Sequence, residues 1–140
     1  MTPRPLRASV VAVVALGGAI GACLRHGLTV TFPDSNNGFP WTIFAINVVG
    51  SFVLALLPAF AAVRRRDLLP PLLGTGVLGG FTTLSTYAEQ TRVLVAEGHE
   101  MTAATYVVGT VAVCLLAVAV ADRFSSSAAR TEFEDEEGDL

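Results

Sequence analysis

The sequence contains no lysine, and charged residues make up only 15% of its 140 residues. Apolar residues make up 52%, whereas soluble domains usually combine a similar apolar fraction with far more charge. The net charge of -3 comes from an acidic run at 132–139, which holds half of the acidic side chains. Scarcity of charge therefore excludes an ordinary soluble domain, and no nucleic acid partner is expected.

Cysteine is nearly absent too, and the two that occur, Cys23 and Cys114, are far apart within apolar runs. This excludes a disulfide framework and a cysteine-rich zinc site, and we interpret both as small buried hydrophobic residues. Catalytic groups are equally scarce. Both histidines lie at the edges of apolar segments, and no span holds a pair of carboxylates or a serine beside a base. We therefore expect no enzyme.

Long apolar runs dominate what is present. Four of them, at about 9–28, 41–63, 68–95 and 102–121, are long enough to cross a bilayer as helices. The first lacks a convincing signal-peptide cleavage site and is interpreted as a retained span. These runs predict an all-α integral membrane domain over residues 1–125 with four transmembrane helices, followed by a disordered acidic tail at 126–140.

The third apolar run is the most interrupted. Gly74, Gly76, Gly79 and Gly80 precede a cluster of hydroxyl side chains in the motif GGFTTLSTY. Glycine weakens a helix, and irregular backbone at membrane depth requires protein, water or an ion as a partner. We predict a break near Gly79–Gly80 whose freed carbonyl groups could hold a cation.

Arginine placement predicts an orientation. Seven of the nine arginines fall on one predicted side of the membrane: Arg4, Arg7, Arg64, Arg65, Arg66, Arg123 and Arg130. The positive-inside rule then places both termini in the cytoplasm of a multi-pass protein in the cell inner or plasma membrane. Arg25 and Arg92 lie near the outer ends of spans. Arg25 could reach the interface by snorkelling or raise the positive potential at the mouth of an anion path.

The spans carry neutral hydrogen-bonding groups, which can hold a partly dehydrated ion without trapping it. They are Asn47, Ser51, Thr82, Thr83, Ser85, Thr86, Tyr106 and Thr110. Each has a structural alternative: Asn47 could join two helices, and a hydroxyl could bond to the carbonyl of the preceding turn. Tyr106 and Thr110 are spaced i, i+4 and share a helical face, and packing with such a back-bond explains them equally well.

Three motifs in order resemble the fluoride channel family called Fluc or CrcB. They are GGAIGACLRH at 17–26, FPWTIFAINVVGSF at 39–52 and GVLGGFTTLSTY at 76–87. The resemblance implies a passive fluoride exporter that lowers the intracellular fluoride concentration. It also implies an antiparallel dual-topology dimer with two anion paths and a structural sodium ion, Na+, on the dimer axis.

The family's site residues can be transferred to matching positions. The resemblance places the pore asparagine at Asn47, the hydroxyl track at Ser85 and Thr86, its extension at Tyr106 and Thr110, and the first-span arginine at Arg25. It places the sodium-binding backbone carbonyls at Gly79 and Thr82.

The departure from the family pattern lies in its aromatic box, where two phenylalanines of GGFTTFSTF are Leu84 and Tyr87 here. A ring edge carries partial positive charge and can contact an anion, whereas leucine cannot. The strong arginine bias also disfavours insertion in both orientations. We therefore hypothesise a heterodimer with a homologous subunit of opposite orientation, with a homodimer as the alternative.

Two other functions remain open at this stage. A non-conducting structural subunit of a heteromeric channel would tolerate Leu84. A small four-span drug or metabolite transporter would be expected to carry a mid-membrane carboxylate for proton coupling, whereas Glu89 lies nearer the outer end of its span.

Overall fold

The computed structural model describes residues 7–34 and 38–125, which form helices and their connections without any strand. The predicted acidic tail, Arg4 and Arg130 lie outside these residues. Within the described residues, three helices are long and apolar enough to cross a membrane: α1 (Ala8–Thr31), α2 (Trp41–Leu56) with its extension η1 (Leu57–Ala59), and α6 (Glu100–Asp122). The described part of the chain is therefore all-helical, and its long apolar helices are those of a multi-pass membrane protein.

The second helix ends earlier than predicted. It stops at Ala59, Phe60 is extended, and a short helix α3 (Ala61–Arg64) follows, so the expected end at Val63 is wrong. Pro58 lies in this last turn and lacks the N–H group that would continue the helix. The guanidinium of Arg64 donates a hydrogen bond to the carbonyl of Pro58 at 2.7 Å, which stabilises the bend.

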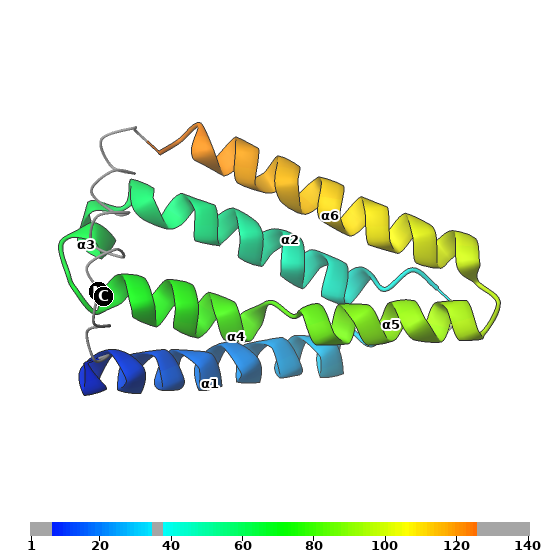
Figure 1. The fold of residues 1–140 in the computed structure, drawn as a ribbon, viewed down its shortest axis with the longest axis horizontal. Helices are drawn as coiled ribbons and strands as arrows, with labels where there is room; N and C mark the ends of the chain where they lie inside the picture. The colour runs from blue at the N-terminus through cyan, green and yellow to red at the C-terminus, as the bar shows by residue number, and fades with distance from the viewer. Residues whose placement is uncertain (1–6, 35–37, 126–140) are drawn as a thin grey trace, which may run out of the picture.

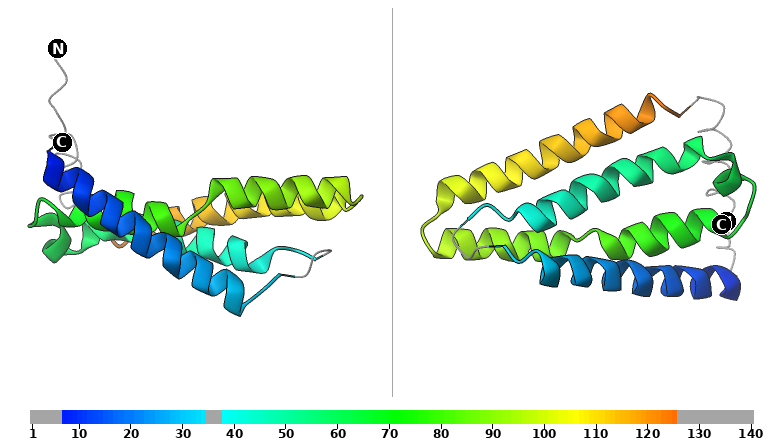
Figure 2. Two further views of the ribbon diagram at one scale, coloured as in Figure 1. Left: turned by 90° about the horizontal axis from the view of Figure 1, so that it is seen from below. Right: turned by 180° about the vertical axis from the view of Figure 1, so that it is seen from behind.

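The long elements run back and forth along one axis (Figure 1). The start of α1, the short helix α3 and the end of α6 lie at one end of the molecule, and the α1–α2 and α5–α6 connections lie at the other. Helix α1 packs along the first half of the third segment, whereas α2 packs along α6 (Figure 2). Between α5 and α6 the turn is tight because Gly98 adopts a positive φ of 79°.

Small residues bring α1 into backbone contact with the third segment. A Cβ atom added at Gly17 would overlap the carbonyl of Leu72, and one at Gly21 would overlap the carbonyl of Val77. Gly76 faces Gly17 from the opposite side. Gly17 and Gly21 therefore form a close-packing face on α1, as two small residues four positions apart on a helix allow.

The third segment consists of a π-helix, η2 (Pro71–Leu78), the short continuation α4 (Gly79–Phe81), and α5 (Leu84–Ala96). Gly79 and Gly80 are helical, so the break begins two residues after the predicted glycine pair. The extended residues are Thr82 (φ -74°, ψ 158°) and Thr83 (φ -151°, ψ 121°). The glycines instead allow close approach to α1, because a Cβ atom at Gly80 would overlap the backbone of Gly18.

Candidate functional site

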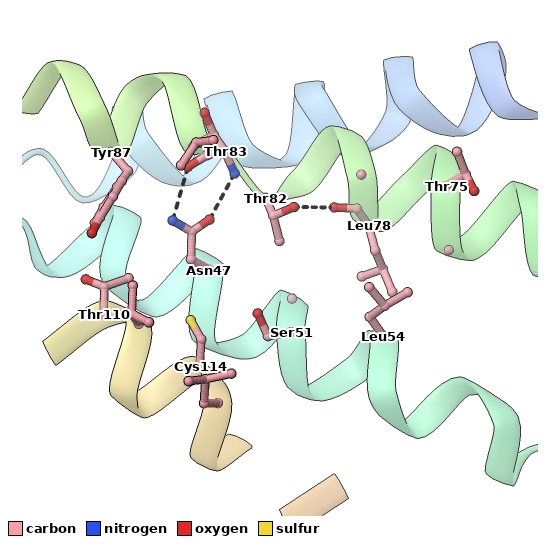
Figure 3. A pocket seen from close by; sticks show the side chains of 16 residues that line it. Asn47, Ser51, Leu54, Thr75, Leu78, Thr82, Thr83, Tyr87, Thr110 and Cys114 are labelled. Atoms are coloured by element: carbon pink, nitrogen blue, oxygen red, sulfur yellow. Dashed lines mark hydrogen bonds between the residues drawn. The ribbon is translucent and has the colours of Figure 1, made fainter. Parts of the chain in front are cut away.

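An open groove of about 770 Å³ runs along α2, the third segment and α6. Its polar wall comes from both sides of the extended pair Thr82–Thr83 and from the facing helices (Figure 3). The lining residues that carry a hydrogen-bonding or ring group are Asn47, Ser51, Thr75, Thr82, Thr83, Tyr87, Thr110 and Cys114. Leu54, Leu78, Leu84, Val111 and Leu115 supply apolar wall.

Asn47 projects from α2 onto the extended residues of the third segment (Figure 3). Its Nδ2 donates to the carbonyl of Thr83 at 3.2 Å, and the Thr83 N–H donates to its Oδ1 at 2.9 Å. This two-way hydrogen bond satisfies backbone groups that would be costly to leave unpaired. The structural alternative for Asn47, a bond between helices, is therefore confirmed, and the same side chain also lines the groove.

Thr83 lies at the centre of the hydroxyl cluster and is the N-cap residue of α5. Its Oγ1 accepts the N–H of Thr86 at 3.1 Å, the N-cap arrangement that satisfies a donor of the first helical turn. The same oxygen donates to Thr86 Oγ1 at 3.1 Å and lies 3.2 Å from Ser85 Oγ. Ser85 and Thr86 therefore gather around Thr83, and neither lines the groove.

Thr82 turns its methyl group toward α2 and its hydroxyl back toward its own helix. Both its N–H and its Oγ1 donate to the carbonyl of Leu78, each at 2.9 Å. Its Cγ2 occupies the space where a Cβ atom on Gly50 would lie. Only glycine at position 50 leaves room for this close packing of α2 against the break.

The extended pair redirects two donors away from the helix carbonyls. In an uninterrupted helix the N–H of Thr83 would bond to the carbonyl of Gly79, and that of Thr86 to the carbonyl of Thr82. Here these donors bind Asn47 Oδ1 and Thr83 Oγ1 instead. Gly79 and Thr82 both line the groove. Neutral carbonyl oxygens at an interrupted helix suit an alkali cation, so the two residues fit the sodium ligands that the resemblance implies.

Arg25 lies on the other side of the third segment. Its Nε donates to the carbonyl of Gly80 at 3.3 Å, and it does not line the groove. The side chain is half-buried and bonds to the backbone just before the break, an arrangement that neither sequence alternative described.

The aromatic residues and Thr110 come together where α5 meets α6. Tyr87 lines the groove and donates its hydroxyl to the carbonyl of Val107 at 3.1 Å. Tyr106 is fully buried, packs 5.0 Å from the Tyr87 ring between ring centroids, and donates to Gln90 Oε1 at 2.8 Å. It therefore supports the wall from behind.

Thr110 differs from the other threonines of the spans. Its side chain is only 4% exposed, and its Oγ1 has no hydrogen-bond partner among the described residues. The back-bond that served as its structural alternative is not formed. A buried hydroxyl without a partner costs about 1–3 kcal/mol, so this donor is available to a ligand in the groove.

Leu84 and the cysteines complete the comparison with the sequence predictions. Leu84 lines the groove and is 78% exposed, which makes it the most accessible large side chain at the break. The interpretation of both cysteines as buried is wrong, because Cys23 is exposed on α1 and Cys114 is half-buried in the groove wall.

The sequence predictions missed two important groups. The sequence predictions include Thr83 only as one of several hydroxyl residues and do not identify it as an N-cap. A threonine followed by a helical segment is a typical N-cap signal. Gln90, the acceptor for Tyr106, carries no signal beyond its polarity within an apolar segment. Glu89 pairs with Arg92 at 2.7 Å on the exposed face of α5 and does not line the groove.

Comparison with known proteins identifies the family. Residues 12–121 match the family model described as CrcB-like protein, Camphor Resistance (CrcB). The chain belongs to the CrcB family. Within it, the chain is 46% identical to fluoride-specific ion channel FluC 2 of Streptomyces avermitilis over 112 residues, which cover 74% of this chain and 67% of that protein.

Two further CrcB relatives carry the same kind of name. Fluoride-specific ion channel FluC 1 of Streptomyces coelicolor is 45% identical over 80% of this chain and 74% of its own length. Fluoride-specific ion channel FluC 2 of Nocardia farcinica is 39% identical over 90% of this chain and 94% of its own length. The likeness therefore extends over nearly the whole membrane domain.

Proposed function

We propose that this chain is a subunit of a fluoride-specific ion channel that passively exports fluoride from the cytoplasm. The fluoride-channel names of its relatives support this substrate. The observation that carries the proposal is the buried, unpartnered hydroxyl of Thr110 in a groove between membrane helices. Fluoride is a small anion that accepts strong hydrogen bonds, and such donors replace part of its hydration shell.

The transferred anion residues have different roles in this proposal. Thr110 and Tyr87 contact the groove directly, and Asn47 forms its wall at the break. Ser85 and Thr86 belong to the hydroxyl cluster beside it. Tyr106 orients Tyr87 by packing, and Arg25 adds positive charge behind the break.

The groove is open along one side of the chain, which supports an antiparallel dimer with a second subunit covering it. In this dimer each chain crosses the membrane four times, with the third crossing interrupted at Thr82–Thr83. The termini lie in the cytoplasm, and the protein resides in the cell inner or plasma membrane. The second subunit is a homologue with two phenylalanines in its aromatic box, because Leu84 leaves one aromatic position empty in this chain. It has the opposite orientation, because the arginine bias of this chain selects a single orientation.

A structural sodium ion at the dimer interface is part of the proposal. The carbonyls of Gly79 and Thr82 supply its ligands from this chain, since their helical donors are redirected to Asn47 and Thr83. When bound, the ion supplies positive charge that holds two interrupted helices together.

A non-conducting structural subunit is the second candidate function, and the exposure of Leu84 favours it. A chain that offers leucine where an anion needs a ring edge could serve only to complete its partner's path.

Substitution of Thr110 tests the proposed function and separates the two candidates. We expect Thr110→Val to slow fluoride efflux from liposomes holding the chain and a CrcB homologue, roughly tenfold for a lost hydrogen bond of about 1.4 kcal/mol. The protein should be as stable as before or more stable, because the substitution removes a buried hydroxyl that has no partner. Thr105→Val is the control, since Thr105 is exposed and bonds only to the carbonyl of Met101. Unchanged efflux with Thr110→Val would favour the structural subunit.

A further inference from the structure

We infer that Asn47 is a positioning residue for the cation site: its side chain keeps the Gly79 carbonyl available by binding the N–H that would otherwise close the helix onto it. The inference rests on the proposed function, because it concerns the sodium site of the proposed dimer. It assigns to Asn47 a role distinct from contact with the anion.

The geometry at the break supports this role. Thr83 N–H has two possible acceptors, the carbonyl of Gly79 in a continuous helix and Oδ1 of Asn47 in the extended form. The structure contains the second bond at 2.9 Å, reinforced by the return bond from Asn47 Nδ2 to the Thr83 carbonyl. Because one side chain makes both bonds, the amide stabilises the extended form over the helical one.

The carbonyls on either side of Gly79 already accept hydrogen bonds from side chains, which distinguishes Gly79 from both neighbours. The carbonyl of Leu78 accepts two bonds from Thr82, and that of Gly80 accepts the Nε of Arg25. Gly79 lines the groove, whereas Gly80 does not. Asn47 and Arg25 therefore have opposite effects on adjacent carbonyls. Asn47 binds the N–H that would otherwise bond to the Gly79 carbonyl, whereas Arg25 donates a hydrogen bond to the Gly80 carbonyl.

The position of Asn47 also couples the two proposed sites. It lies on the wall of the groove that carries the anion and, through Thr83, controls a carbonyl of the cation site. A substitution at this residue can therefore change cation binding and anion passage separately. Oδ1 determines whether the Gly79 carbonyl is free to bind the cation, and the neutral charge of the amide allows an anion to pass.

Two substitutions separate these atoms. Asn47→Ala removes the acceptor, so the Thr83 N–H returns to Gly79 and the cation site is lost. Asn47→Asp keeps the acceptor for the Thr83 N–H and loses only the return bond to the Thr83 carbonyl, so cation binding persists, but its negative charge repels an anion. Thr91→Val is a matched control in the same segment, because Thr91 bonds only to the carbonyl of Tyr87 in its preceding turn.

The experiment measures sodium binding without reference to conduction. The full-length chain, in its dimer with a CrcB homologue of opposite orientation, is heated in detergent at increasing sodium concentration, with N-methylglucamine maintaining the ionic strength. We expect sodium to raise the melting temperature of the wild type, Asn47→Asp and Thr91→Val. For Asn47→Ala the half-saturating sodium concentration should rise by roughly 10- to 100-fold, the usual effect of losing a residue that orients a metal ligand.

Each outcome has a distinct meaning. If sodium stabilises the wild type and Asn47→Ala at the same concentration, the positioning role is wrong, whereas the proposed sodium site remains. If sodium fails to stabilise the wild type, the proposed site is wrong and the inference is overturned with it. Loss of sodium binding in Asn47→Asp would also contradict the inference. Circular dichroism of Asn47→Ala without sodium checks that its helices form.

Discussion

Single side chains at the break make different contributions although they are neighbours in sequence. Thr82 bonds back to its own helix, Thr83 begins the next helix, and Leu84 is exposed to the groove. Three consecutive residues thus end one helix, begin another and form a surface. Their separate roles follow from the extended conformation of Thr82 and Thr83, because an uninterrupted helix would turn successive side chains about 100° apart on one cylinder.

At the residue scale, the ring missing from position 84 can be restored. In liposomes that hold the chain and a CrcB homologue, we expect Leu84→Phe to raise fluoride efflux about fivefold, which corresponds to a ring-edge contact of about 1 kcal/mol. Stability should change by less than about 0.5 kcal/mol, because the side chain is 78% exposed.

Leu84→Met is the control for this substitution, since methionine is apolar and flexible but has no ring. An equal rise in efflux with Leu84→Met would show that side-chain volume, rather than the ring, limits the rate.

At the element scale, the packing of α1 on the third segment depends on the absence of side chains. Gly17 and Gly21 in α1 face Gly76 and the backbone of Val77 in η2, where an added Cβ atom would meet main-chain atoms. Main chain cannot move aside as a flexible side chain can. This contact holds the first half of the third segment in place, while the Asn47 amide holds its extended end.

Gly21→Ala tests this packing. We expect it to lower the stability of the protein by about 1–3 kcal/mol, because the new methyl group overlaps the carbonyl of Val77 and the nitrogen of Phe81. Thermal unfolding in detergent measures the change. Gly27→Ala, on the same helix, is the matched control.

A Cβ atom at Gly27 would meet no other atom within 4 Å, so alanine there should be neutral or stabilise the helix by up to about 1 kcal/mol. Equal melting temperatures for the two variants would contradict close packing at Gly21.

At the scale of the whole molecule, the arginine distribution and the open groove lead to the same expectation. A strong bias selects one orientation in the membrane, and the open groove leaves a face that the proposed second subunit would cover. A homodimer of antiparallel chains would need the same sequence to insert in both orientations. The proposed heterodimer resolves this conflict by assigning the second orientation to another chain.

The whole-molecule prediction is that the chain expressed alone inserts in one orientation and supports little fluoride efflux. A fluorescent protein fused at the C-terminus, which fluoresces in the cytoplasm, and a periplasmic phosphatase fused at the same position report the orientation. Co-expression with a CrcB homologue of opposite bias should restore efflux. Robust efflux from the chain alone would contradict the heterodimer and favour a homodimer.

Much of the architecture could be predicted from the sequence because the bilayer imposes strong local requirements. Apolar runs must form helices of spanning length, and Gly17 and Gly21 define a close-packing face through their spacing alone. Such patterns depend on residues that are neighbours in sequence or on one helical face. The motif GGFTTLSTY likewise indicated an interruption, although it did not locate the extended residues correctly.

Only the tertiary structure decided which of these residues act together. Asn47 and Thr83 are far apart in sequence. Their two-way hydrogen bond stabilises the extended backbone at Thr82–Thr83, whereas the sequence pointed to the glycine pair. Arg25 reaches the Gly80 carbonyl across the α1 packing face, and Thr110 has no partner because of how α6 packs. Hydrogen bonding of a polar group inside a membrane depends on what lies within about 3 Å of it, and a single sequence does not specify those distances.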